Sequence, residues 1–347
     1  MSLAPSTLVP CEDIQGRLDE YINTCDSAAL RESMPFWDFL WSPLNRTGIQ
    51  QLIVPGGGKT RTAKLIYEQR ILESEVDTTS SCDLACEATT ERGNLSATYE
   101  IDCSGYVAEE KITPTDWREI CTPNSVLFER KLQKLIDAVV RKSATGLTTQ
   151  AASLLGGWAS DVSGVNGSDQ LVINTLKPST SDLNPGFMQD IDFAAMQSGY
   201  CNGKVIFGQA QLAKAYGTLQ AGCCSAQGVD LRAMLDAYNT AVLYDYRVAS
   251  AAGATISWIV MPQALQPIYL TMNDNDIPLQ GANYYKSVIF DSKSGLPMDL
   301  VISDNCGVIS MIVTARVKLV SLPLDLFAPG DRMEGVNYFG AIKVTNT

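Results

Sequence analysis

The feature that most constrains the fold is a long polar stretch, residues 50–122, that has strand-like ends and little apolar content. Two strand-like runs, Thr62–Ile71 and Ser96–Val107, flank a turn-rich segment at Val76–Gly93. Alternating apolar and polar residues on both sides of a polar tip predict a long antiparallel hairpin. Because so few apolar residues are available, the hairpin cannot bury a core of its own. We therefore expect an extension that reaches away from the body of the molecule.

Charge is unevenly distributed along this stretch. Its first strand opens with bases and no acid: Lys59, Arg61 and Lys64. From Glu68 to Glu110 there are eleven acids against two bases, Arg70 and Arg92. Separated positive and negative segments suit contacts between different subunits. The alternative is a solvated hairpin that happens to be unevenly charged.

The clearest helix is expected at 124–143, after the start signal of Pro123. Its apolar residues recur at helical spacing and form one stripe: Phe128, Leu132, Leu135, Ile136 and Val139. The opposite face is mainly basic: Arg130, Lys131, Lys134, Arg141 and Lys142, against Glu129 and Asp137. Thr145–Gly146 is expected to end this helix, and a second short helix is expected at Thr148–Leu155.

The remaining sequence predicts an α+β protein without regular βαβ alternation. Further helices are expected at 11–24, Gln209–Leu219 and Asp230–Leu243. Strands are expected at Val205–Phe207, Ile256–Met261, Ser287–Phe290, Pro297–Ile302, Gly307–Leu322 and Val336–Val344, with a turn at Asp291–Gly295. A dense aromatic cluster (Phe36, Trp37, Phe39 and Trp41) is expected to lie against the chain's own core or against a neighbouring subunit.

The amino-acid composition excludes several common kinds of active site. The 347 residues include no histidine, so neither a Ser-His-Asp nor a Cys-His arrangement can form. The net charge of −12 argues against a dedicated nucleic-acid reader, which carries a basic surface. The most apolar stretch, Thr255–Met272, is interrupted by prolines and glutamines and does not read as a membrane span.

Local motifs indicate no catalytic residue, no cofactor site and no metal site. Gly56–Thr60 resembles the end of a phosphate-binding loop, but Ile53 replaces the required first glycine and a strand follows where a helix is needed. Asp190 and Asp192 could share one face, but no further acid completes a cation site. The ten cysteines read mainly as packing residues: Cys11, Cys25, Cys82, Cys86, Cys103, Cys121, Cys201, Cys223, Cys224 and Cys306.

The order of these parts resembles the major capsid protein of a tailed bacteriophage, with the Hong Kong 97-like fold. The most suggestive local pieces are Phe128–Leu155 and the ending Val317–Lys343. The resemblance implies an α+β capsid fold with an N-terminal arm, an extended β-hairpin loop, a long spine helix, and peripheral and axial domains. It places the arm at 1–50, the extended loop at 51–122, the peripheral domain with its spine helix at 123–195, the axial domain at 196–304 and return strands of both domains at 305–347.

The resemblance further implies a structural subunit without catalytic residues. Such subunits assemble with copies of themselves as hexamers and pentamers into an icosahedral shell around double-stranded DNA. The expected partners are scaffold and portal proteins and, in some cases, cement proteins, with non-specific proximity to DNA and no membrane. The expected location is the virion capsid, after synthesis in the host cytoplasm. The alternatives are an encapsulin-type nanocompartment shell protein, a phage tail or neck component, and a carboxylate-based enzyme or ligand-binding protein.

Overall fold

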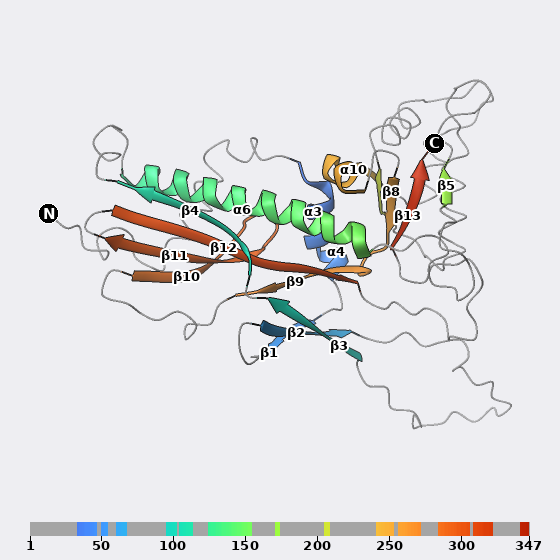
Figure 1. The fold of residues 1–347 in the computed structure, drawn as a ribbon, viewed down its shortest axis with the longest axis horizontal. Coiled ribbons are helices and arrows are strands. Elements are labelled where there is room, and N and C mark those ends of the chain that lie inside the picture. Colours follow the sequence, from blue (N-terminus) through green and yellow to red (C-terminus); the bar gives the residue numbers. More distant parts are fainter. Residues whose placement is uncertain are drawn as a thin grey trace, which may run out of the picture.

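The computed structural model describes residues 33–46, 50–54, 60–67, 95–102, 104–113, 124–154, 171–173, 205–208, 241–252, 256–271, 284–305, 308–321 and 341–346. Within these ranges the strands form three sheets, and one long helix runs along the central sheet (Figure 1). The helices in the same ranges are α3 (Pro35–Trp41), α4 (Pro43–Arg46), α6 (Asn124–Leu154) and α10 (Tyr246–Ala252). No helix in the described part of the chain is long and apolar enough to cross a membrane.

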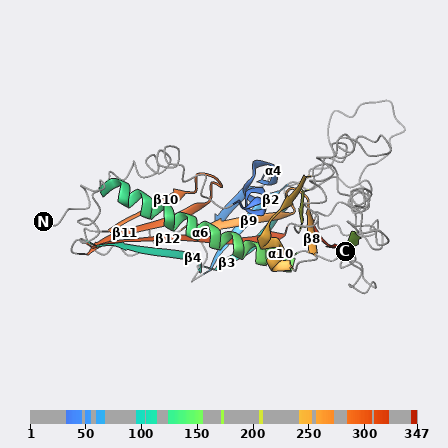
Figure 2. The same cartoon turned by 90° about the horizontal axis from the view of Figure 1, so that it is seen from above.

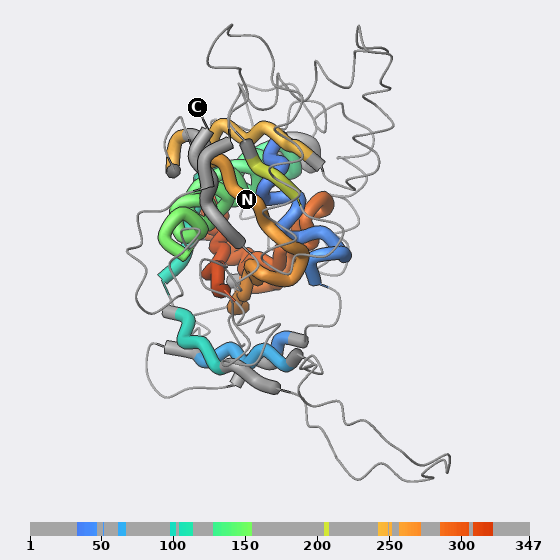
Figure 3. The backbone as a smooth tube through the Cα atoms, turned by 90° about the vertical axis from the view of Figure 1, so that its right-hand side faces the viewer, coloured from blue at the N-terminus to red at the C-terminus, as the bar shows by residue number. Residues whose placement is uncertain are grey.

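The predicted hairpin is present. Its strands are β1 (Gln50–Val54), β2 (Thr60–Tyr67) and β3 (Leu95–Asp102), which form an antiparallel sheet in the order β1-β2-β3. The pairing of β2 with β3 runs from Thr60 opposite Asp102 to Tyr67 opposite Leu95. Figure 3 shows this sheet as a layer set apart from the body of the molecule.

The second arm of the hairpin ends earlier than expected. The single strand predicted over Ser96–Val107 is wrong, because β4 (Tyr106–Ile112) is a separate strand that pairs with β12. Gly105 marks the change of direction. A Cβ atom at Gly105 would lie 2.6 Å from the carbonyl oxygen of Ala315, so only glycine allows the chain to cross so close to β12.

The central sheet is built on one long strand. Its order is β10-β11-β12-β4, and β9 pairs with the far end of β12. The strands are β9 (Leu265–Leu270), β10 (Tyr284–Phe290), β11 (Pro297–Asn305) and β12 (Val308–Ser321). The long strand predicted at 307–322, the strands at 287–290 and 297–302 and the turn between them are therefore confirmed, whereas β9 was not predicted.

The third sheet joins distant segments in the order β5-β13-β8-β6-β7. Its strands are β5 (Leu171–Ile173), β6 (Val205–Gly208), β7 (Ala241–Tyr244), β8 (Ile256–Val260) and β13 (Ala341–Asn346). The predicted helix at Asp230–Leu243 is wrong at its end, because parallel pairing with β6 holds residues 241–244 as a strand. The helices expected at 11–24 and 209–219 lie outside the described residues.

Helix α6 is continuous, so the predicted end at Thr145–Gly146 and the separate second helix are wrong. Gly146 does not break the helix but makes room for a neighbour. A Cβ atom there would collide with the phenol oxygen and ring of Tyr106 on β4. Next to it, the hydroxyls of Thr145 and Thr148 donate hydrogen bonds to carbonyls one turn earlier, at 3.1 and 2.7 Å. These side chains therefore satisfy their polar groups inside the helix.

The main core lies between α6 and the central sheet. The stripe predicted from the sequence faces β12, whose alternate residues from Ile309 to Leu319 are buried beneath it. Figure 2 shows α6 running along this sheet. The aromatic cluster of α3 belongs to the same core, with Phe36 and Trp37 each 1% exposed. Of the two placements left open for this cluster, burial in the chain's own core is the one observed.

Candidate assembly surfaces

The root of the hairpin is attached to the body by a small apolar cluster. Ala63, Leu65 and Ile101 of the hairpin sheet pack against Ile268 and Leu270 of β9, together with Val320 of β12. Adjacent residues of a strand point to opposite faces. Leu319 lies in the main core with α6, whereas Val320 lies under the hairpin. The hairpin root and α6 therefore occupy opposite faces of the central sheet.

Hydrogen bonds to main-chain oxygens fix the same root. The hydroxyl of Tyr99 donates to the carbonyl of Ser321 at 3.0 Å. The ammonium of Lys318 donates to the carbonyl of Glu100 at 2.9 Å. On β1, the side-chain amide of Gln51 donates to the carbonyl of Tyr269 at 2.5 Å. These hydrogen bonds fix the orientation of the hairpin sheet relative to β9 and β12.

Helix α6 exposes a basic ridge on the face turned away from the core. The exposed members of this ridge are Arg130, Lys134, Arg141 and Lys142. Lys131, at its edge, forms an ion pair with Glu110 of β4 at 2.9 Å and donates to the carbonyl of Lys111. No acid in the described part of the chain pairs with Arg130, Lys134 or Lys142. The ridge is therefore a positively charged surface on a chain whose net charge is −12.

The face of the central sheet opposite α6 exposes apolar side chains on its two edge strands, β4 and β10. The strand register aligns Val107, Thr314, Asp299 and Val288 across four strands. Val107 is 58% exposed, and Phe290, two residues beyond Val288 on β10, is 51% exposed. Thr314 and Asp299, between them in the row, are buried, so the exposed apolar side chains stand at the two edge strands of the sheet. Exposed apolar side chains of this size can serve in contacts with a neighbour. Sequence reasoning missed this face because alternation identifies the two faces of a strand without showing which one is covered.

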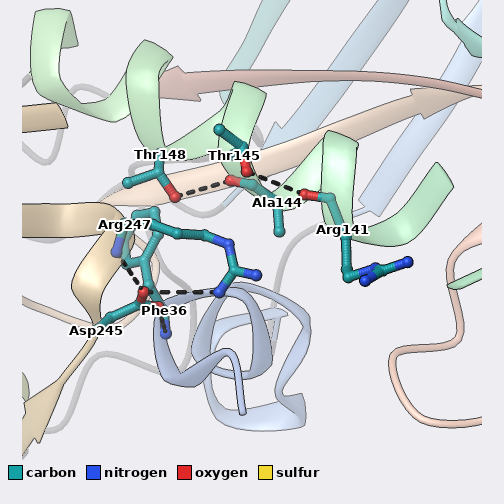
Figure 4. A network of polar contacts seen from close by, with 7 residues as sticks. All are labelled: Phe36, Arg141, Ala144, Thr145, Thr148, Asp245 and Arg247. Atoms are coloured by element: carbon teal, nitrogen blue, oxygen red, sulfur yellow. Dashed lines mark hydrogen bonds and ion pairs between the residues drawn. The ribbon is translucent and has the colours of Figure 1, made fainter. Parts of the chain in front are cut away.

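The short helix α3 is held at its start by a buried carboxylate (Figure 4). Asp245 accepts hydrogen bonds from the main-chain N–H groups of Phe36 and Arg247, at 3.1 and 3.0 Å. The ring of Phe36 then packs edge-on against Phe207 and Trp258, with centroids 5.0 and 5.3 Å apart. Sequence reasoning gave no signal for Asp245, because its partner Phe36 lies 209 residues away.

Two other buried carboxylates, Asp299 and Asp291, also serve the fold. Asp299 forms an ion pair with Arg316 across neighbouring strands, and Asp291 accepts hydrogen bonds from the main chain and hydroxyl of Ser294. Among the described residues, no three carboxylates or cysteines gather as metal ligands would. The residues that carry chemistry in hydrolases and metalloenzymes are therefore used here to build the scaffold, as far as the structure describes it.

A pocket of about 440 Å³ lies where the hairpin root, β4, the end of α6 and the end of β12 meet. Its lining combines apolar groups such as Ile101, uncharged polar groups such as Gln150 and Ser153, and one cation, Lys318. Gln150 is occupied in holding the strand, because its side-chain oxygen accepts a hydrogen bond from the N–H of Leu319 at 2.8 Å. Burial raises the pKa of Tyr106, at the rim, above its usual value of 10.0. Nothing in this lining forms a catalytic arrangement.

Most motifs weighed in the sequence lie outside the described residues. These are the glycine-rich segment at residues 55–59, the aspartates at 190 and 192, and all ten cysteines. The strand that follows the glycines is described: residues 60–67 form β2 where a phosphate-binding loop requires a helix.

No family model matches the sequence, and no curated protein matches it. Solved structures do resemble the chain. A chain of the cyanophage A-1(L) capsid asymmetric unit is 12% identical, with a TM-score of 0.50, over 90% of this chain and 92% of that chain. The capsid of Ralstonia phage GP4 is also 12% identical, with a TM-score of 0.44, over 91% and 92%. A structure of Mycobacterium phage Adephagia is 12% identical, with a TM-score of 0.42, over 95% and 97%.

The cyanophage comparison covers nearly the full length of both chains, so it concerns the whole architecture and not a shared fragment. The chain has the α+β fold of a phage capsid subunit of the Hong Kong 97 type, which confirms the fold class predicted from the order of its parts.

Proposed function

We propose that this chain is the major capsid protein of a tailed bacteriophage. It assembles with copies of itself, as hexamers and pentamers, into an icosahedral shell that encloses double-stranded DNA. The observation that carries the proposal is the likeness to the cyanophage capsid chain over 90% of this chain and 92% of that one. Fold alone does not determine function. The surfaces described above supply the second argument.

Those surfaces are the ones that a shell subunit needs. A hairpin with little apolar content is fixed at its root, a basic ridge runs along α6, and apolar side chains are exposed on the edge strands of the central sheet. None of these features stabilises a monomer. In an assembly, neighbouring subunits bury the exposed apolar area and pair with the exposed charges.

The domain plan follows the same proposal, with two adjustments that the strand pairing supports. The extended loop ends near residue 105, because β4 pairs with β12 in the body. The N-terminal arm ends before α3, because α3 is part of the main core. The peripheral domain then holds α6 and the central sheet, and the axial domain holds the third sheet.

We propose a structural role without catalysis. Three buried carboxylates in the described part of the chain, Asp245, Asp291 and Asp299, hold main-chain N–H groups or an arginine, which leaves them unsuited to act on a substrate. A carboxylate-based enzyme is therefore not favoured, and neither is an encapsulin-type shell, since the comparison that covers both chains is with a phage capsid. Scaffold, portal and cement proteins remain proposed partners, with the virion capsid as location.

Electron microscopy of the purified full chain tests the proposal directly. The expected result is closed shells tens of nanometres across, or capsomers that close into shells on addition of a scaffold protein. A small species of uniform size that never forms capsomers or shells, at any salt concentration or pH tried, would overturn the proposed function.

A further inference from the structure

The basic ridge of α6 has no acidic partner in the described part of its own chain. Its members Arg130, Lys134, Arg141 and Lys142 are exposed, and none of them forms an ion pair there. The rise of about 1.5 Å per residue spreads these four charges over about 18 Å of helix. Surface charges contribute little to the stability of a fold, so four clustered bases are better explained by a contact outside the chain.

All exposed charges on the described face of α6 are positive. The helix contains two acids, Glu129 and Asp137, and both are half-buried. The carboxylate of Asp137 accepts a hydrogen bond from the side-chain amide of Gln133 at 3.1 Å. Toward the end of the helix, the exposed hydroxyls of Thr145 and Thr149 donate to carbonyls one turn earlier, at 3.1 and 3.0 Å. The exposed face is therefore positive along the ridge and uncharged beyond it.

Two partners in the proposed shell can supply negative charge to the ridge, a neighbouring subunit and the enclosed DNA. A straight ridge of one sign fits a partner whose negative charge is continuous along a line. Double-stranded DNA carries one negative charge per about 1.7 Å of its axis, so about ten phosphate charges lie along the length of the ridge. Arginine and lysine are also the usual donors to DNA phosphates. The pattern of charge therefore favours DNA over a neighbouring subunit.

The fold leaves the ridge accessible to a long partner. Helix α6 packs on the face of the central sheet that holds Leu319, whereas the hairpin root packs on the opposite face, which holds Val320. Figure 1 shows β2 and β3 on one side of β9 and β12 and α6 on the other. The described part of the hairpin therefore does not obstruct a duplex that lies along α6.

We propose that the basic ridge of α6 binds the phosphate backbone of the enclosed double-stranded DNA. The inference rests on the proposed function and names the surface of the subunit that contacts the genome. Binding does not depend on base sequence, because phosphates carry no sequence information. The chain as a whole has a net charge of −12, so the duplex is repelled elsewhere and contact is confined to the ridge. Four charges per subunit give a weak contact that salt screens.

The salt dependence of DNA binding tests this contact. Fluorescence anisotropy of a labelled 20-base-pair duplex measures the affinity of the dilute full chain, before shells close, over a range of salt concentrations. Four phosphate contacts predict that the logarithm of the binding constant falls with the logarithm of the salt concentration with a slope of about −3.6. A second duplex of unrelated sequence is expected to bind with the same affinity.

Neutralising two members of the ridge assigns the binding to this surface. The double variant Arg130→Gln, Lys134→Gln is expected to bind DNA about tenfold more weakly at low salt, with a slope of about −1.8. The matched controls are Arg130→Lys with Lys134→Arg, which keeps the charge, and Lys111→Gln with Lys293→Gln, which removes two charges at exposed positions off the ridge. Both controls are expected to keep the slope of the unmodified chain.

The outcomes separate this inference from the proposed function. If the unmodified chain binds no DNA at low salt, or if the ridge variant binds it as well as the off-ridge control does, the inference is overturned. If the ridge variant binds DNA normally but no longer closes shells, the ridge contacts a protein partner and the inference is again overturned. If the unmodified chain never forms shells and only the ridge variant loses DNA binding, the proposed function fails and the contact with DNA stands.

Discussion

Gly146 shows how one residue can be misread when only its type is known. A glycine after a long amphipathic run usually marks the end of a helix. Here it lies inside α6 because the ring of Tyr106 occupies the place where a side chain would be. The residue is required by a contact between a helix and a strand, and that contact joins residues 40 positions apart in the chain.

The substitution Gly146→Ala tests this explanation. Helix propensity alone would stabilise the fold by about 1 kcal/mol. We expect the opposite sign, a loss of about 1–3 kcal/mol, because the new methyl group forces the Tyr106 ring out of its site. Urea unfolding of the variant measures the change.

A double-mutant comparison is the control for that result. In a Tyr106→Ala background the obstacle is gone, so Gly146→Ala should stabilise the chain. The same loss in both backgrounds would show that Gly146 is required for a reason unrelated to the ring.

Tyr106 also predicts a dependence of stability on pH. Its folded-state pKa is raised above 10.0 by burial, so the folded chain holds the phenol proton more tightly than the unfolded chain does. Stability from this group is complete below pH 10 and is lost as the pH rises from about 10 through the folded-state pKa. We expect Tyr106→Phe to lose less stability than the unmodified chain between pH 9 and 11, measured by urea unfolding at both values. Equal losses would contradict this.

At the scale of elements, α6 and β12 form the unit on which the fold depends. Leu135 and Ile136 are buried between them. Truncating either to alanine leaves a cavity, so we expect Leu135→Ala or Ile136→Ala to lower the free energy of unfolding by about 2–5 kcal/mol. The matched control is Lys131→Ala on the other face, where a partly exposed ion pair with Glu110 should contribute about 0–1 kcal/mol. A melting temperature that neither core substitution changes would contradict the burial of these residues between α6 and β12.

Sequence patterns predicted elements well where burial and periodicity agree. The stripe of α6, the long apolar run of β12 and the alternation of β2 and β3 were all visible, because each element buries one continuous face. Patterns failed where a distant partner decides the local structure. Parallel pairing with β6 makes residues 241–244 a strand, and pairing with β12 makes Tyr106–Ile112 a strand of the central sheet and not of the hairpin. For the candidate surfaces, the basic ridge was predicted, whereas the exposed apolar side chains on the edges of the central sheet could not be.

For the whole molecule, the hairpin should contribute to assembly more than to folding. Its root buries only a small cluster, separate from the main core. Deleting Asp77–Asn94 removes chain beyond the paired strands and leaves β3 intact. We expect a soluble subunit whose melting temperature is nearly unchanged and that no longer closes shells, measured by calorimetry and electron microscopy. Replacing the same residues with a Gly-Ser linker of equal length is the control for chain length. A deletion variant that is unfolded would instead assign the segment to the core.

The long strand β12 has a consequence for how this protein is made. It is the partner of β4 and α6, yet it follows β4 by about 200 residues in the chain. Translation adds about 5–20 residues per second, so about 10–40 s pass between the synthesis of β4 and the synthesis of β12, the strand that pairs with it. During that interval the apolar stripe of α6 lacks β12, the strand that it packs against most extensively. The nascent chain is therefore a natural client for chaperones until its last tenth emerges.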